Sequence, residues 1–420
     1  MLSVDEALAR TAALPVPRRV RWRGLGAALG AVLAEEVRAD LPLPPFDNSA
    51  MDGYAVPDGL SAGGALPVSG RRAAGDAPGD ALAPGTAIRI FTGAAVPPGA
   101  TAVIAQEDAT PADGGTVRFG VTPQAGQHIR RAGSDLAAGA TALAAGTILH
   151  PGAIALAAAC GRSRLRVADP PRIAILGTGD ELVPPGRRPP PGSIRATNNP
   201  MLAAWVAASG GVPLDLGVAG DRRAALESAF ARALDQRPDL ILSTGGVSVG
   251  ELDLVRAVLG GDALDFWKVR MKPGKPLAVG RVGGVPVFAL PGNPASAAVS
   301  FTLFVRPWIR RALGDPSPHS PVIDVRLRSP VLRSPGRPEL WRASVRLAAD
   351  GVWHADPAAS ASSGSLVGLS QANALLLFGE GRGGAEAGDS VPALLLHAAP
   401  HGSPVPALRW GGRPSAGTSG

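Results

Sequence analysis

Cysteine is almost absent from this chain. Cys160 is the single cysteine among 420 residues, which excludes an intramolecular disulfide and any zinc or iron–sulfur site built from several cysteines of one chain. This scarcity is typical of a reducing compartment, and we expect a cytoplasmic location. Asp5 and Glu6 stand where a secretory signal would be basic, so the start of the sequence predicts a capped helix and no targeting segment.

Long apolar runs and aromatic residues are also scarce. The longest uncharged stretch, residues 282–305, contains Pro286, Pro291 and Pro294, which makes a membrane helix a poor interpretation of it. The net charge is +7, but the basic residues are spread thinly and aromatic residues make up only 4% of the chain. We therefore expect neither a membrane nor a nucleic-acid partner, and a small anionic ligand fits the charge equally well.

Lysine is the scarcest of the common charged residues. Of 41 basic residues only three are lysines, and Lys268, Lys272 and Lys275 all fall within WKVRMKPGKP. An ammonium group is a compact point charge, whereas a guanidinium group is a planar fork, so a phosphate pocket can require one and not the other. The clustering favours a phosphate-binding loop, although chance survival of three lysines in an arginine-rich sequence is the alternative.

The pattern along the chain predicts a multidomain α/β plus β protein. Apolar runs followed by glycine-bearing loops and helical stretches between residues 171 and 318 are typical of βαβ units, and they predict a central, doubly wound parallel sheet. Residues 1–45 and 146–170 show helical spacing, including a second helix over residues 25–37. We expect five segments, namely a helical N-terminal domain (1–45 plus 146–170), an inserted β domain (46–145), the α/β domain (171–318), a small C-terminal β domain (319–398) and a disordered tail (399–420).

Glycine loops follow three of the predicted strands. In STGGVSVGELD, Gly245 and Gly246 allow backbone amides to approach an anion, and Ser248 adds a hydroxyl donor. Asp253 either stabilises the dipole of the following helix or points outward to bind a metal ion. The carboxyl ends of parallel strands meet along one crevice, so these loops predict a site for a phosphate-bearing ligand.

Carboxylates gather at the same strand ends. Asp180 and Glu181 follow one strand in GTGDEL, and Asp221 follows another in VAGDRR, so with Asp253 four acids are expected to face one crevice. Like charges at about 4 Å repel by ~1 to ~4 kcal/mol, so a divalent cation or a basic partner is expected. Oxygen ligands of this kind suit Mg²⁺, while helix capping or pairing with arginines is the alternative.

Two further loops complete the predicted site. Lys272 and Lys275 lie in MKPGKP, where prolines stiffen a loop that can clamp phosphate oxygens. Asn293 and Ser296 in PGNPAS precede another helix, either as ligand contacts or as an ordinary strand-to-helix turn with an asparagine cap. None of the six histidines falls in these loops, so histidine-based general base catalysis has no candidate here.

Six motifs, in order, resemble the molybdopterin molybdenumtransferase family, which includes the bacterial MoeA-type enzymes and the E domain of gephyrin. They are PPFDNSAMDGYAV, FTGAAVPPGATAVIAQED, RRAGSDL, STGGVSVGELD, MKPGKP and ALPGNPASA, and the resemblance runs to about residue 398. It implies a four-domain homodimer that inserts molybdate into adenylated molybdopterin, releases AMP with the help of Mg²⁺ and forms molybdenum cofactor. The molybdopterin adenylyltransferase and acceptor molybdoenzymes are the protein partners that it implies.

The resemblance also implies roles for individual residues. By their places in the motifs, Asp52, Asp135, Glu181 and Asp253 match catalytic positions. Thr92 joins the residues of the glycine and lysine loops as a substrate contact. The acids implied to bind Mg²⁺ are Glu181, Asp221 and Asp253.

Two departures from the family pattern and two rival functions accompany this interpretation. Ala196 stands where the family usually has an acid before the pair that contains Asn198, and GRPELWRA varies a usual GR-x-E-F stretch. The first rival function is that of a molybdopterin adenylyltransferase, but such an enzyme would not need the first 170 residues. A non-catalytic dimeric scaffold that binds molybdopterin or protein partners would not need the intact acidic and lysine motifs.

Overall fold

The computed structural model describes residues 1–77, 79–245, 264–348, 351–359 and 362–396. The chain forms two compact units, one made of Met1–Arg19 with Ala168–Gly420 and the other of Val20–Val167. Helix α1 (Val4–Ala12) therefore belongs to the first unit, although its sequence neighbours up to residue 45 were expected to accompany it. The predicted cap is present as a capping box, in which the side chains of Ser3 and Glu6 each accept a hydrogen bond from the other's backbone N–H.

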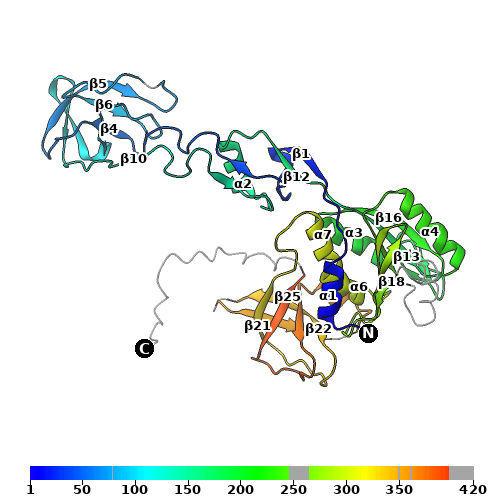
Figure 1. Ribbon diagram of the computed structural model, residues 1–420. Coiled ribbons are helices and arrows are strands. Elements are labelled where there is room, and N and C mark those ends of the chain that lie inside the picture. The colour runs from blue at the N-terminus through cyan, green and yellow to red at the C-terminus, as the bar shows by residue number, and fades with distance from the viewer. Residues whose placement is uncertain (78, 246–263, 349–350, 360–361, 397–420) are drawn as a thin grey trace, which may run out of the picture. The chain divides into compact units, whose positions relative to one another are not determined.

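A six-stranded sheet forms the centre of the first unit (Figure 1). Its order is β16 (Val212–Ala219), β13 (Arg172–Thr178), β17 (Leu240–Thr244), β20 (Val285–Leu290), β19 (Ala278–Val282) and β18 (Leu264–Trp267). The first four strands are parallel, as predicted, but β19 runs antiparallel to β20, and β18 pairs antiparallel with β19. The difference arises because Gly283 and Gly284, both with positive φ, form a two-residue hairpin turn between β19 and β20.

Helices cover both faces of this sheet. Leu226 and Phe230 of α4 (Arg223–Asp235) are buried in one apolar cluster with Ala174 and Leu176 of β13. Side chains alternate along a strand, so Ile173 and Ile175 of β13 face the opposite side, where α3 (Asn198–Ala208) buries Leu202 and Val206. Further helical turns follow β20, namely α6 (Pro294–Ser300), the π-helical η5 (Phe301–Val305) and α7 (Arg306–Ala312). A doubly wound architecture results, and it fixes the strand ends that carry the site.

The C-terminal strands close into a small barrel in the same unit. Its order is β21 (Val322–Leu327), β23 (Trp353–Pro357), β22 (Glu339–Leu347), β24 (Ala374–Phe378) and β25 (Ser390–Leu395), with helix α8 (Leu366–Ser370) before β24. Alternate residues such as Val325, Val345 and Phe378 fill its interior. A tail was predicted for residues 399–420, and it lies outside the described residues.

The second unit contains the predicted inserted β domain. Its six-stranded sheet has the order β7 (Ala102–Ala105), β4 (Gly53–Val56), β6 (Ala87–Ile90), β5 (Ala65–Arg72), β9 (Thr116–Phe119) and β8 (Ala109–Ala112). Two short 3₁₀ turns, η2 (Gln106–Asp108) and η3 (Asp113–Gly115), flank β8. Val56, Ile104 and Phe119 pack together in its core.

The rest of the second unit corrects one prediction. Residues 25–37 were expected to form a helix, but only the 3₁₀ turn η1 (Leu25–Ala27) and the start of β2 (Val37–Arg38) occur there. Val32 and Leu33 are buried as their spacing suggested, yet the N–H of Leu33 donates to Thr147 O at 2.9 Å. Tertiary partners therefore replace the helical hydrogen bonds.

The remaining elements pair in short ladders. Helix α2 (Pro151–Ala159) is present as predicted, while β2 pairs with β11 (Thr141–Leu143). The other short pairs are β1 (Val20–Gly24) with β12 (Arg164–Ala168), β3 (Asn48–Ser49) with β10 (Ile129–Arg130), and β14 (Leu182–Val183) with β15 (Ile194–Arg195). Among the helices that the structure describes, none is both long and apolar enough to cross a bilayer.

A candidate active site at the strand ends

A cavity of about 1090 Å³ lies where the parallel strands β13, β17 and β20 end. The carboxyl ends of neighbouring parallel strands converge in such folds, so their loops share one crevice. Residues that the sequence singled out contribute to its wall, namely Glu181, Asp221, Gly245, Lys272, Lys275, Asn293 and Ser296. The predicted gathering of glycine, acidic and lysine loops is therefore found in the first unit.

Gly245 brings the end of β17 against β13. It has a φ of +93°, and a Cβ built on it would collide with the backbone oxygen of Thr178. Only glycine fits both the left-handed backbone and this close approach. Gly245 thus lets backbone, rather than a side chain, form this part of the cavity wall.

Asn198 joins two of the strand-end loops. Its Nδ2 donates to Thr244 Oγ1 and to Gly292 O, each at 2.7 Å, and Thr244 Oγ1 donates to Pro291 O at 3.2 Å. Asn198 Oδ1 is buried and has no hydrogen-bond partner within the described part of the chain. Buried polar groups are usually paired, so this acceptor in the wall is suited to a donor group of a bound ligand.

The acids divide between two tasks. Glu181 and Asp221 line the cavity, whereas Asp180 lines a smaller neighbouring pocket. The backbone N–H of Asp180 donates to Asp221 Oδ2 at 3.3 Å, and that of Asp221 donates to Asp180 Oδ1 at 3.2 Å. The expectation that Asp180 faces the same crevice is wrong, because Asp180 lines the smaller pocket instead. The reciprocal pairing uses one carboxylate oxygen of each aspartate, so Asp221 both lines the cavity and helps to hold the two loops together.

The MKPGKP loop presents both of its lysines at the cavity. Lys272 and Lys275 are exposed there, whereas Lys268 does not line it. Gly274 between them has a φ of +98° and a Cβ there would lie 2.5 Å from Met271 Cε, so the loop is tightly packed from beneath. Buried backbone and exposed ammonium groups are the arrangement expected of an anion clamp.

Asn293 occupies the N-cap position of α6 but makes no capping hydrogen bond with its side chain. Its Nδ2 instead donates to Ser363 Oγ at 3.0 Å, and the N–H of Ala295 donates to Ser363 O at 3.0 Å. The simple cap considered for Asn293 is therefore not what the structure shows. Ser296, one turn further, is only 5% exposed.

The C-terminal barrel region contributes residues that the sequence analysis did not select. Arg337, Ser363 and Leu366 line the cavity, as does Arg195 from β15. The GRPELWRA stretch, which was noted only as a departure from the family pattern, was the one signal for Arg337. With the two lysines, the wall carries four cationic side chains and two carboxylates among the described residues.

Three predicted site residues, Asp52, Thr92 and Asp135, belong to the second unit. Asp52 Oδ1 accepts hydrogen bonds from both the backbone N–H and the Oγ1 of Thr92, each at 2.7 Å. The Thr92 backbone N–H, with the hydroxyl second, lowers the pKa of Asp52, so this carboxylate stays ionised at mildly acidic pH. Asp135 is exposed, and its own N–H donates to Leu43 O at 2.9 Å.

Thr92→Val is expected to raise the pKa of Asp52 part of the way toward its ordinary value. The substitution removes the hydroxyl donor and keeps the backbone donor, which has the larger effect. A lowered folded-state pKa contributes stability above the ordinary carboxyl pKa and loses it as the pH falls through the lowered value, so the variant gives up part of that contribution. Carboxyl-carbon NMR titration measures the change, with Thr86→Val as control. An unchanged Asp52 titration would contradict this assignment.

Gly246, Ser248 and Asp253 lie outside the described residues. Within the described ranges, no group of three or more histidine, cysteine, aspartate or glutamate side chains is placed to hold a metal ion. The two carboxylates in the wall nevertheless suit Mg²⁺, because this ion is commonly bound by one or two carboxylates together with substrate phosphates.

Comparison with known proteins places each region of the chain. Residues 2–161 match the family described as MoeA N-terminal region (domain I and II), residues 174–311 match a probable molybdopterin binding domain, and residues 324–396 match the MoeA C-terminal region (domain IV). Molybdopterin molybdenumtransferase 2 of Mycobacterium tuberculosis is 44% identical over 323 residues, 72% of this chain and 78% of that protein. The molybdopterin molybdenumtransferase of Bacillus subtilis is 34% identical over 94% of each chain.

Solved structures agree with the sequence relatives. A crystal structure of the molybdopterin biosynthesis MoeA protein from Pyrococcus horikoshii matches with a TM-score of 0.81 and 28% identity, covering 94% of this chain and 100% of that one. Fold and cavity together define an α/β protein with a cavity lined by cationic and acidic side chains at the carboxyl ends of its parallel strands. The chain belongs to the molybdopterin molybdenumtransferase family, the MoeA family, as its motifs predicted.

Proposed function

We propose that this chain transfers molybdenum from molybdate to molybdopterin, with adenylated molybdopterin as the substrate and AMP as a product. The observation that carries the proposal is the cavity at the strand ends. Its wall contains four cationic side chains, those of Lys272, Lys275, Arg195 and Arg337, together with the backbone of Gly245, which has no side chain of its own to cover it. Both substrates are anions with several oxygens, and a cluster of cationic donors around exposed backbone suits them.

The cavity residues take complementary roles in this proposal. The ammonium groups of Lys272 and Lys275 bind phosphate or molybdate oxygens, and Asn293 and Ser296 add polar contacts at the start of α6. Gly246 and Ser248, which lie outside the described residues, are proposed as substrate contacts beside Gly245. In the reaction an oxygen of water or of molybdate forms a bond to one phosphorus of the adenylated substrate as the phosphoanhydride bond breaks, so that one phosphate stays on molybdopterin and the other leaves with AMP.

We further propose Mg²⁺ as the cofactor, held by Glu181 and Asp221 together with Asp253. The two described carboxylates come from neighbouring strand-end loops and line the cavity in which the substrate phosphates would bind. When bound, Mg²⁺ supplies positive charge to the phosphoanhydride oxygens and eases departure of AMP. Without it, Glu181 and Asp221 would repel the anionic substrate.

The remaining roles rest on the family resemblance. We propose Asp52 and Asp135 as catalytic residues, with Glu181 and Asp253, and Thr92 as a substrate contact. On the same basis we propose that the chain forms a homodimer and is located in the cytoplasm. Its proposed protein partners are the adenylyltransferase and acceptor molybdoenzymes, with which it would exchange ligands. A scaffold without catalysis is the alternative, and the cationic and acidic groups retained in the cavity favour catalysis over it.

Reconstitution of a cofactor-free molybdoenzyme tests the proposal. The purified chain, adenylated molybdopterin, molybdate and Mg²⁺ are expected to restore the activity of the acceptor enzyme, and omission of the chain or of molybdate is expected to leave it inactive. If the chain bound adenylated molybdopterin tightly but restored no activity, the scaffold would be the better account.

A further inference from the structure

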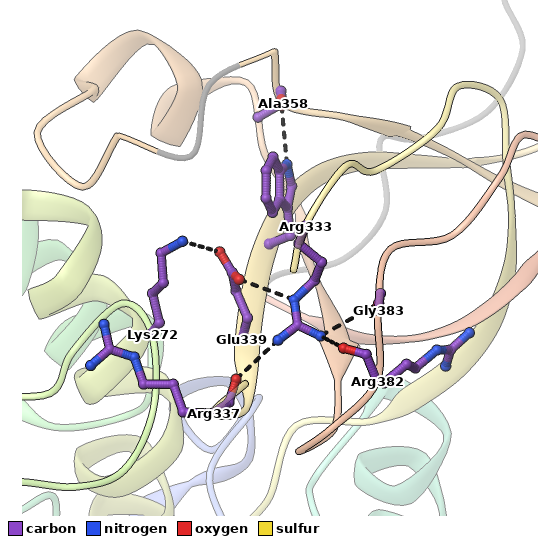
Figure 2. Close-up of polar contacts among 8 residues, drawn as sticks. Lys272, Arg333, Arg337, Glu339, Ala358, Arg382 and Gly383 are labelled. Atoms are coloured by element: carbon purple, nitrogen blue, oxygen red, sulfur yellow. Dashed lines mark hydrogen bonds and ion pairs between the residues drawn. The ribbon is translucent and has the colours of Figure 1, made fainter. Parts of the chain in front are cut away.

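A buried carboxylate links one cavity lysine to the barrel (Figure 2). Glu339 begins β22 and is 5% exposed. Its Oε1 lies 2.9 Å from Lys272 Nζ, and its Oε2 accepts a hydrogen bond from Arg333 Nε at 3.1 Å. One glutamate therefore connects an ammonium group in the cavity wall to a guanidinium group beneath it.

Arg333 is fixed by backbone oxygens on the barrel side. Its side chain is 3% exposed, and its Nη2 donates to Arg337 O at 3.0 Å. Its Nη1 donates to Arg382 O and, at 3.4 Å, to Gly383 O, as Figure 2 shows. A guanidinium group held by three carbonyl oxygens and one carboxylate has little freedom to move, so it fixes the position of Glu339.

The backbone of the lysine loop is attached to the same strand. The N–H of Lys272 donates to Pro338 O at 2.9 Å, and the N–H of Leu340 donates to Lys272 O at 2.8 Å. Lys272 and Glu339 are thus partners in a short parallel bridge. The bridge fixes the backbones of Lys272 and Glu339 side by side, while Arg333 holds the carboxylate.

We propose that Glu339 is a positioning residue, which holds the Lys272 ammonium group where it meets the oxyanion of the substrate. This inference deepens the proposed function and rests on it. A free lysine side chain has a flexible four-carbon stem and loses conformational entropy when it binds a ligand. With Nζ held by Glu339, part of that ordering is already complete, and two of the three N–H donors remain for the ligand.

The charges of the three residues are consistent with this role. Glu339 carries one negative charge between two positive groups, so the set Arg333–Glu339–Lys272 keeps a net charge of +1 toward the cavity. The Lys272 side chain is 47% exposed while that of Glu339 is 7% exposed, so an incoming anion reaches the ammonium group rather than the carboxylate. Arg333 supplies the counter-charge that a buried carboxylate requires.

Two substitutions of Glu339 distinguish a role in positioning the Lys272 ammonium group from a role in folding. Glu339→Gln removes the charge, and Glu339→Asp keeps the charge but is one methylene too short to reach both Arg333 and Lys272. Each is expected to raise the KM for molybdate, and the Kd for molybdate in calorimetry, by about five- to tenfold, with kcat changing less than twofold. Thermal unfolding identifies any variant that has lost its fold, and Glu339→Asp, which keeps a negative charge near the buried Arg333, is the safer of the two.

Glu380→Gln is the matched control. Glu380 Oε1 lies 2.5 Å from Arg270 Nη2, so this variant breaks another ion pair between the lysine-loop segment and the barrel region without touching Lys272. Both partners of that pair are about half exposed, and its loss is expected to leave KM and Kd for molybdate unchanged.

A double-mutant cycle with Lys272→Met decides whether Glu339 acts through the lysine. In the Lys272→Met background, Glu339→Gln is expected to cause no further loss of molybdate affinity, because the group that it positions is gone. Losses that multiply would overturn the proposal and assign Glu339 a purely structural role, as would an unchanged KM in both Glu339 variants. If Lys272→Met itself left molybdate binding intact, the proposed function of this cavity would fail instead.

Discussion

Gly245→Ala is expected to lower the free energy of unfolding by about 2–4 kcal/mol, since it forces a side chain into a left-handed position with no space. Gly245 has a φ of +93°, and the added methyl group would lie 2.8 Å from Thr178 Oγ1 and closer still to Thr178 O. Both obstacles belong to the end of the interior strand β13, which has a neighbouring strand on each side and cannot yield easily. Denaturant unfolding followed by circular dichroism measures the loss.

The same substitution is expected to weaken molybdate binding, because any relief of the collision moves the strand ends apart. Gly292→Ala is the control within the same cavity. Gly292 has no positive φ, and a Cβ there would meet only Gly245 Cα at 3.6 Å, an ordinary contact. We expect a change below about 1 kcal/mol for Gly292→Ala. If Gly245→Ala and Gly292→Ala lowered the free energy of unfolding equally, the close approach of Gly245 to Thr178 would not be what determines stability here.

Replacement of Lys275 is expected to have the second large effect. Lys275→Met removes a cation that lines the cavity and should raise the KM for molybdate by about 100-fold. Lys275→Arg keeps the charge but replaces a compact ammonium group by a planar fork on a tightly packed loop, and about a tenfold increase is expected. Steady-state kinetics with varied molybdate measures both.

Arg281→Met is the matched control for the loss of one positive charge. Arg281 is exposed on β19 and does not line the cavity, so its removal is expected to leave the KM for molybdate unchanged. An equal increase in KM for Arg281→Met and Lys275→Met would mean that net charge, and not the lysine loop, attracts the anion. Equal affinity of Lys275→Arg and the parent chain would contradict the argument from lysine clustering.

The sequence predicted the parts of the fold that depend on local pattern. Apolar runs followed by glycine loops identified β13, β17 and β20 and the cavity at their ends. The pattern over residues 25–37 failed because the spacing of Val32, Leu33 and Val37 reports burial, whereas the backbone hydrogen bonds that define a helix go instead to distant segments. Burial and helicity coincide in α1 but not there.

The barrel's contribution to the site could not be read from spacing. Arg337 and Ser363 lie far along the chain from the lysine loop, and only the packing of the barrel against that loop brings them to the cavity. The pairing of Asp180 with the neighbouring loop was equally hidden, since a carboxylate at a strand end looks the same whether it faces a ligand or accepts backbone N–H groups. The resemblance supplied Asp52, Thr92 and Asp135, which no pattern of charge or glycine had marked.

Release of AMP from adenylated molybdopterin by the purified chain tests the central claim most directly. With Mg²⁺ present, we predict that AMP is released when molybdate is added, that Lys275→Met strongly reduces this release at limiting molybdate, and that Arg281→Met does not. Failure of the chain to bind or cleave adenylated molybdopterin under these conditions would contradict the assignment of this cavity as a molybdenum insertion site.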